Sequence, residues 1–134
     1  MSDEVIGELR NTVNATRVVS VENDTVVLEL SAAGTGQFLG QAVTDFGTHV
    51  STRYLDGTES ASAQIVITSE SGQGQLVLVG SATGEVGAGG TVTFKGMVTA
   101  RAPEGPFAEL NGKALLGESV VDPDGIAVHH YRRY

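Results

Sequence analysis

Two small groups of side chains in this sequence could do chemistry. Tyr54 and Glu59 flank an Asp56-Gly57 turn, and His129 and Tyr131 lie near the end of the chain. A carboxylate against apolar walls acquires a raised pKa and can act as a general acid or base. A histidine and a tyrosine can orient a carbonyl or hydroxyl group of a ligand. We take Tyr54, Glu59, His129 and Tyr131 as the candidate catalytic residues. Two plainer interpretations stay open: Glu59 is a rim glutamate in water, and the C-terminal strand only covers the seam of a barrel.

Most familiar catalytic and binding motifs are missing from the chain. It contains no cysteine, which excludes disulfide scaffolds, thiolate metal sites and cysteine nucleophiles. His129 and His130 are adjacent, so in a strand they point to opposite faces and cannot chelate one metal together. Gly34-Thr35-Gly36 precedes no predicted helix, so it is not a phosphate loop. A Gly-x-Ser-x-Gly sequence, typical of one large class of hydrolases, is also missing. We therefore expect neither a metal nor another cofactor.

Composition narrows the possible partners. The 134 residues include 8 basic and 16 acidic ones, which gives a net charge of -8. An acidic chain without a basic patch argues against binding to nucleic acid or to anionic membranes. The apolar runs are far shorter than a membrane-spanning helix requires. The N-terminus, Met1-Ser2-Asp3-Glu4, is acidic where a signal peptide would be basic, so we expect a cytoplasmic protein.

The elements that must position the candidate residues are predicted to be strands. From Arg17 onward, apolar residues recur with a period of two between turn-forming clusters, which is typical of an all-β sandwich or barrel. A two-residue turn at Asp56-Gly57 pairs Tyr54 with Glu59 and Val50 with Ala63. A final hairpin across Asp122-Pro123-Asp124-Gly125 places His129 opposite Ser119. About eight strands with short connections favour an antiparallel up-and-down barrel, because closure removes exposed sheet edges.

Two segments complete the predicted domain organisation. Residues 1–16 are expected to form a short N-terminal arm or helix, with Ser2 as the helix cap, and 17–134 a single barrel domain. Residues 107–112, between two predicted strands, are expected to form one helical turn that plugs an end of the barrel.

Small side chains are frequent on the predicted inner face. An eight-stranded barrel is just wide enough either to be filled by its own side chains or to hold one small ligand. Both possibilities stay open: the small residues leave a ligand cavity, or they alternate with large ones to fill a narrowing end. The residues expected to line a substrate are Phe38, Phe46, Val50, Ala61, Ala63, Phe94, Gly96 and Val98.

Several glycine and aromatic motifs of the sequence are similar to those of known small barrels. They are Gly34-x-Gly36-x-Phe38-x-Gly40, the Asp56-Gly57 hairpin, Phe94-x-Gly96 and Gly105-Pro106-Phe107-Ala108-x-Leu110-x-Gly112. This succession resembles the small lipocalin-like barrels of the allene oxide cyclase and dirigent type. It is also similar to compact bacterial barrels that cyclise polyketides, including spirotetronate-forming cyclases. The resemblance implies ring closure without a cofactor, but no catalytic residue of those families maps onto a numbered position here, and the chain has no tryptophan.

Three hypotheses for function follow. The first is a small barrel that binds an apolar molecule and acts as a cofactor-independent cyclase or isomerase of secondary metabolism, as the resemblance implies. The second is a carrier that uses the same cavity without turnover. The third is a filled barrel that acts through its outer surface, for example as a homodimer, because the strand through Leu76 and Val79 is apolar on both faces.

Overall fold

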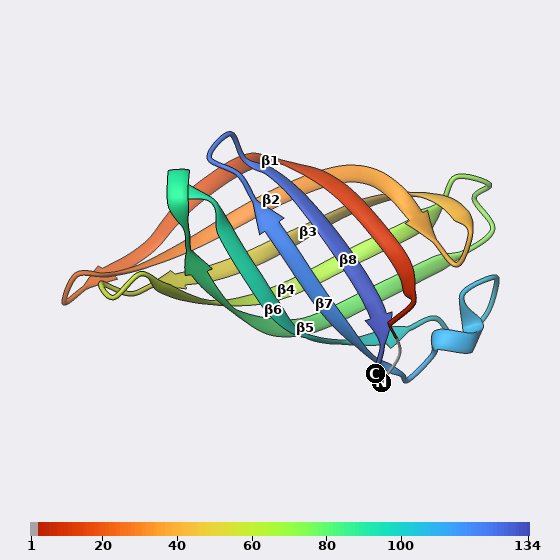
Figure 1. Cartoon of the computed structure of the whole chain (residues 1–134). Helices are drawn as coiled ribbons and strands as arrows, with labels where there is room; N and C mark the ends of the chain where they lie inside the picture. The colour runs from red at the N-terminus through yellow and green to blue at the C-terminus, as the bar shows by residue number, and fades with distance from the viewer. Residues whose placement is uncertain (1–2) are drawn as a thin grey trace.

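Residues 3–134, the part of the chain that this computed structural model describes, form eight antiparallel strands and two short 3₁₀ turns. The elements are β1 (Val5–Glu22), β2 (Thr25–Phe38), β3 (Gln41–Arg53), β4 (Thr58–Ser69), β5 (Gln75–Val86), η1 (Ala88–Gly90), β6 (Val92–Arg101), η2 (Ala108–Leu110), β7 (Ala114–Val121) and β8 (Ile126–Arg133). Each strand pairs with the next, and β8 pairs with β1, which closes the barrel (Figure 1). The predicted all-β up-and-down barrel is confirmed. No helix among these residues is long and apolar enough to cross a membrane.

The first strand starts earlier than the sequence predicted. It begins at Val5, so most of the expected N-terminal arm is the first half of β1, and the expected helix is not formed. Buried Leu9 and Asn11 alternate with exposed Glu8 and Arg10, which is the period of a strand with one face in the barrel. Pairing of this segment with both β2 and β8 outweighs its weak helical signal. The proposed cap Ser2, like Met1, lies outside the described residues.

The β3–β4 hairpin forms at the predicted place with a different register. Arg53, rather than Tyr54, pairs with Glu59. The Tyr54 amide donates to the Thr58 carbonyl oxygen at 3.1 Å, and Gly57 donates back to Tyr54 at 3.2 Å with a φ of 86°. The connection therefore holds one residue more than a two-residue turn, with the glycine in the left-handed conformation that a bulge requires.

That single residue reverses the predicted faces of β3. A slip of one position moves every side chain of a strand to the opposite face of the sheet. Phe46, expected inside, is 60% exposed, and Val50 lies on the outer surface as well. The inner face of β3 instead carries buried Asp45 and Ser51. The β4 side of the hairpin keeps its predicted orientation, with Ala61 and the other odd-numbered residues inside.

One end of the barrel is packed with apolar side chains. Phe107 directly precedes η2, and Leu110 is its last residue; both are fully buried there against Phe38. The Phe38 and Phe107 rings meet edge to face, with centroids 6.5 Å apart and an angle of 83°. The expected plug of one helical turn is thus present. The connections β2–β3, β4–β5 and β6–β7 lie at this end, and the other hairpin tips lie at the opposite rim (Figure 1).

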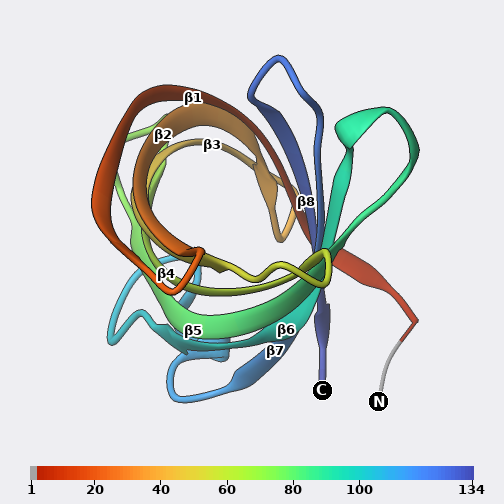
Figure 2. The same cartoon turned by 90° about the vertical axis from the view of Figure 1, so that its left-hand side faces the viewer.

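The half of the barrel near that opposite rim is not filled in the same way. Figure 2 views the barrel from the side of the β1–β2 and β3–β4 hairpin tips and shows β1–β5 curling around the interior. The side chains that β4–β7 turn inward in this half are mostly small, including Ala61, Ala82, Gly96 and Gly117. This half of the barrel contains the candidate site.

Candidate functional site in the barrel lumen

A cavity of about 130 Å³ lies inside the barrel. Alanine and glycine from β4–β7 form one wall of it, so the barrel leaves room where large inward residues would have filled it. Of the residues predicted to line a substrate, the structure places Ala61, Ala63, Phe94, Gly96 and Val98 on this cavity. It places Phe38 in the apolar core at the closed end, and Phe46 and Val50 outside the barrel.

Three rings form a row along another part of the cavity wall. His49 of β3 lies parallel to His129 of β8, with ring centroids 6.1 Å apart and an angle of 1°. His129 is followed by Tyr131, at 6.3 Å and 21°. All three residues line the cavity. The row therefore presents imidazole and phenol groups to any molecule bound in the lumen.

Ser119 of β7 orients the central ring of this row. Its Oγ lies 2.5 Å from Nδ1 of His129, its cross-strand neighbour in the predicted and observed β7–β8 register. The direction of this bond depends on the tautomer of His129; we assign the hydroxyl as the donor, because this gives its proton an acceptor. The proton of the neutral imidazole is then on Nε2. His129 consequently offers an N–H donor to the cavity.

Both cavity histidines are neutral at ordinary pH. Burial, helped by the charges of His49 and His130, lowers the pKa of His129 to about 4. Burial also lowers the pKa of His49 below its usual value. An imidazole in a poorly solvated site keeps its charge only at a cost, so the neutral form prevails. Proton exchange with a ligand, rather than a fixed positive charge, is the chemistry that this pair can supply.

Tyr131 is held as a protonated phenol. Burial, and after it the charge of Asp45, raises the pKa of Tyr131 well above its ordinary value. Its ring packs against Phe38 with centroids 5.5 Å apart. It also covers Gly117, where an added Cβ would lie 3.2 Å from the ring. Glycine at position 117 thus lets the ring approach the strand, and the hydroxyl remains a hydrogen-bond donor at neutral pH.

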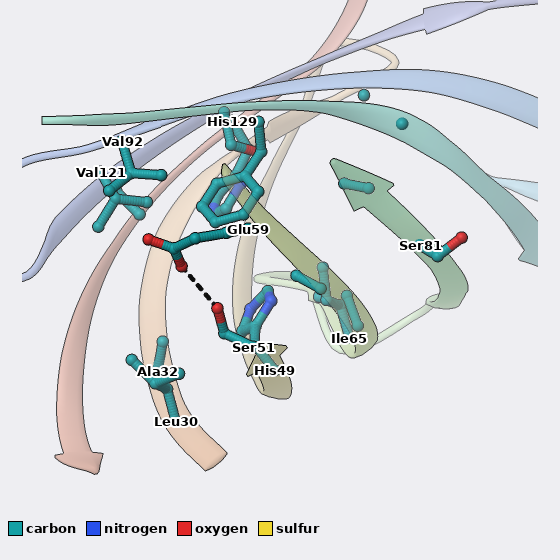
Figure 3. Close-up of a pocket in the computed structure, with 18 of the residues that line it drawn as sticks. Leu30, Ala32, His49, Ser51, Glu59, Ile65, Ser81, Val92, Val121 and His129 are labelled. Atoms are coloured by element: carbon teal, nitrogen blue, oxygen red, sulfur yellow. Dashed lines mark hydrogen bonds between the residues drawn. The ribbon is translucent and has the colours of Figure 1, made fainter. Parts of the chain in front are cut away.

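Glu59 lies on the cavity wall at the start of β4. Its carboxylate accepts a hydrogen bond from the Ser51 hydroxyl at 2.7 Å, shown in Figure 3, and Arg53 Nε lies 3.5 Å from the same oxygen. The Glu59 side chain is 3% exposed, whereas that of Arg53 is 52% exposed. Glu59 is therefore not the fully hydrated rim glutamate that the sequence left open.

Tyr54 is not part of this site. It is 45% exposed at the start of the β3–β4 turn, and its hydroxyl lies 3.3 Å from Ser60 Oγ. Of the four candidate catalytic residues, the structure brings together His129 and Tyr131, adds Glu59 to the same cavity, and leaves Tyr54 outside. Sequence reasoning missed His49, because the slipped register placed it on the outer face. Counting three residues in the turn would have found it.

A buried polar pair lies on the inner face close to the cavity. Asn11 Nδ2 donates to Asp45 Oδ2, while Asp45 Oδ1 has no partner among the described residues. Burial raises the pKa of Asp45, and the hydrogen bond from Asn11 offsets part of this effect. A buried carboxylate with one unsatisfied oxygen is costly when it is ionised.

Metal binding finds no support in the described part of the chain. No group of three or more histidine, cysteine or acidic residues lies close enough there to hold an ion. The polar groups present can instead hydrogen-bond a ligand oxygen and exchange protons with a ligand. The fold and the site together define a small closed β-barrel with a partly polar lumen.

Comparison with known proteins finds related folds only. No family model matches the chain, and no curated protein matches it either. A solved structure of a protein of unknown function from Clostridium acetobutylicum superposes with a TM-score of 0.80, at 12% identity over 100% of both chains. A conserved protein of unknown function from Rhodopseudomonas palustris gives a TM-score of 0.76, at 10% identity over 96% of both chains. The chain thus shares its eight-stranded barrel with these proteins.

Proposed function

We propose that this protein binds a small, mainly apolar molecule bearing a carbonyl or hydroxyl group in its lumen and isomerises or cyclises it without a cofactor. The observation that carries the proposal is the neutral His129, oriented by Ser119 and placed beside Tyr131 in a cavity with otherwise mostly apolar walls. The resemblance to cofactor-free cyclase barrels agrees with this chemistry but does not specify the substrate.

The cavity limits the size of the group that is bound. A cavity of about 150 Å³ with apolar walls holds one benzene molecule, and the lumen here is about 130 Å³. The enclosed part of a ligand is therefore one ring or a chain of similar volume. A longer substrate, such as a polyketide, would extend from the lumen toward the rim, where half-exposed Arg53 lies.

The chemistry assigned to the site is proton transfer next to a carbonyl group. Tyr131 and Nε2 of His129 donate hydrogen bonds to the carbonyl oxygen and stabilise the negative charge that develops there. In a ketone with a double bond between its β- and γ-carbons, His49 takes a proton from the α-carbon and returns it to the γ-carbon. The double bond then lies between the α- and β-carbons, and the net charge is unchanged. Positioned acid and base groups of this kind contribute about 10²- to 10⁴-fold in rate.

A cyclic ketone of one ring tests the proposal. The probe is 3-cyclohexenone, whose double bond moves into conjugation when a proton is removed and returned. We expect the wild-type protein to accelerate this conversion, followed by ultraviolet absorbance, and His129→Gln to lose the acceleration. His130→Gln is the matched control, because this neighbour points outward and contacts Glu8. Failure of the ketone and of other one-ring probes to bind would overturn the proposal.

A non-catalytic carrier is the second candidate, favoured by a specific observation. Burial lowers the pKa of His49, the base of the proposed reaction, which makes it a weaker base than a free imidazole. The same groups then act only as hydrogen-bond donors and acceptors that select a ligand. Tight binding of one-ring ketones, with no acceleration by wild-type protein over His129→Gln, would favour the carrier over the enzyme.

A further inference from the structure

The carboxylate of Glu59 is only partly satisfied by the protein. Ser51 and Arg53 both approach one oxygen, Oε1. The second oxygen has no hydrogen-bond partner among the described residues, although the side chain is only 3% exposed and lines the cavity. Figure 3 shows the carboxylate projecting into the pocket, with its second oxygen turned away from Ser51. That oxygen is not among the buried polar atoms without a partner, so a molecule in the cavity can reach it and bind there.

The charges around Glu59 favour a cation as that molecule. Arg53 is the one lysine or arginine among the residues lining the cavity, and its half-exposed guanidinium approaches Glu59 with Nε at 3.5 Å. His49 and His129 on the same wall are neutral and do not repel a cation. The net charge of -8 attracts cations to the protein and repels anions.

An aromatic ring lies on the same cavity wall, two strands away from Glu59. Glu59 pairs with Gly84 of β5, and Gly84 pairs with Phe94 of β6. A Cβ added at Gly84 would lie 2.6 Å from the Phe94 ring, so the ring covers that glycine on the inner side. Phe94 also lines the cavity. A carboxylate and an aromatic ring that line one cavity can together recognise an ammonium group, through charge and cation–π attraction.

We propose that the ligand of the cavity is a small apolar amine whose ammonium group binds the free oxygen of Glu59, on the cavity wall shared with Phe94. Its apolar part occupies the layer of small residues formed by Ala61, Ala82 and Gly96. This inference rests on the proposed function, since it requires the lumen to be a ligand site. For the proposed isomerase, it specifies a substrate that carries an amine in addition to the carbonyl group held at His129.

Four one-ring probes of similar size test the inference by isothermal calorimetry and NMR. They are benzylamine, benzyl alcohol, toluene and benzoate. We expect benzylamine to bind wild-type protein at least about tenfold more tightly than benzyl alcohol, and benzoate to bind most weakly. In Glu59→Gln the advantage of benzylamine is lost, while the affinities for benzyl alcohol and toluene stay the same. Their unchanged binding also shows that the variant is folded.

Glu85→Gln is the matched control, because Glu85 is an exposed glutamate of β5 next to Gly84 and its loss changes the net charge equally. It should keep the preference for benzylamine. An equal loss in both variants would overturn the inference, since the attraction would then come from overall charge. Binding of the alcohol and toluene without a preference for the amine would overturn the amine inference and leave the ligand site intact. Binding of no probe would overturn the proposed function together with it.

Discussion

The low pKa of His129 makes stability depend on pH in a way that one substitution isolates. In the unfolded chain the imidazole has a pKa of about 6.5, and in the folded barrel burial lowers it to about 4. Between these values the unfolded state binds a proton that the folded state does not, so acid favours unfolding. His129 therefore reduces stability as pH falls from about 6.5 to about 4, and has a constant effect outside that window. One pKa unit corresponds to about 1.4 kcal/mol, so a pKa difference of about 2.5 lowers the free energy of unfolding by about 3 kcal/mol.

Urea unfolding of wild-type protein and His129→Gln between about pH 7 and about pH 4 measures this effect. Asp45 and other carboxyl groups titrate in both proteins, so their contributions cancel in the difference between the two curves. Relative to His129→Gln, the wild type should lose about 3 kcal/mol over the range. Parallel curves for wild type and His129→Gln would refute the assignment of His129 as a buried neutral histidine.

Three further substitutions probe the core and the cavity. Asp45→Asn removes a buried carboxyl group whose pKa is raised, so its ionised form destabilises the folded state. Thermal melts should show that the variant is more stable than the wild type at neutral pH and loses this advantage in acid. Ala63→Trp fills the cavity, so calorimetry should show no binding of one-ring probes while circular dichroism keeps the barrel signature; unchanged affinity would place the site elsewhere. Phe107→Ala empties the plugged end and should cost about 3–5 kcal/mol in urea unfolding, and a cost below about 1 kcal/mol would show that the plug is dispensable.

The barrel itself was predictable because local signals agreed with one another. Alternating apolar residues and short turns define strands, and a chain of eight paired neighbours closes to remove its edges. The β7–β8 register was also correct: Ser119 was predicted opposite His129, and the structure forms that pair. The early start of β1 was missed because Gly7 and a few polar residues obscure the apolar alternation of this segment. Its pairing with β8 is what makes it a strand.

The polar wall of the site was harder to predict, and β3 shows why. Its inner face carries Asp45, His49 and Ser51, while its outer face carries Phe46 and Val50. A rule that places apolar residues inside therefore chooses the wrong face of this strand. The extra residue in the turn sets the register. The glycine at this turn suits a two-residue and a three-residue connection equally, so the sequence does not distinguish them. Departures from the apolar pattern are expected where a strand supplies polar groups to a binding site.

Imidazole nitrogen NMR during titration with 3-cyclohexenone tests the central claim, ligand binding in the lumen at His129, most directly. The three histidines serve as internal reporters, because His49 and His129 line the cavity and His130 points outward. Saturable shifts of the His49 and His129 signals, with His130 unchanged, are the predicted result. Absence of shifts at His129, or shifts confined to His130, would contradict the claim that the lumen is the functional site.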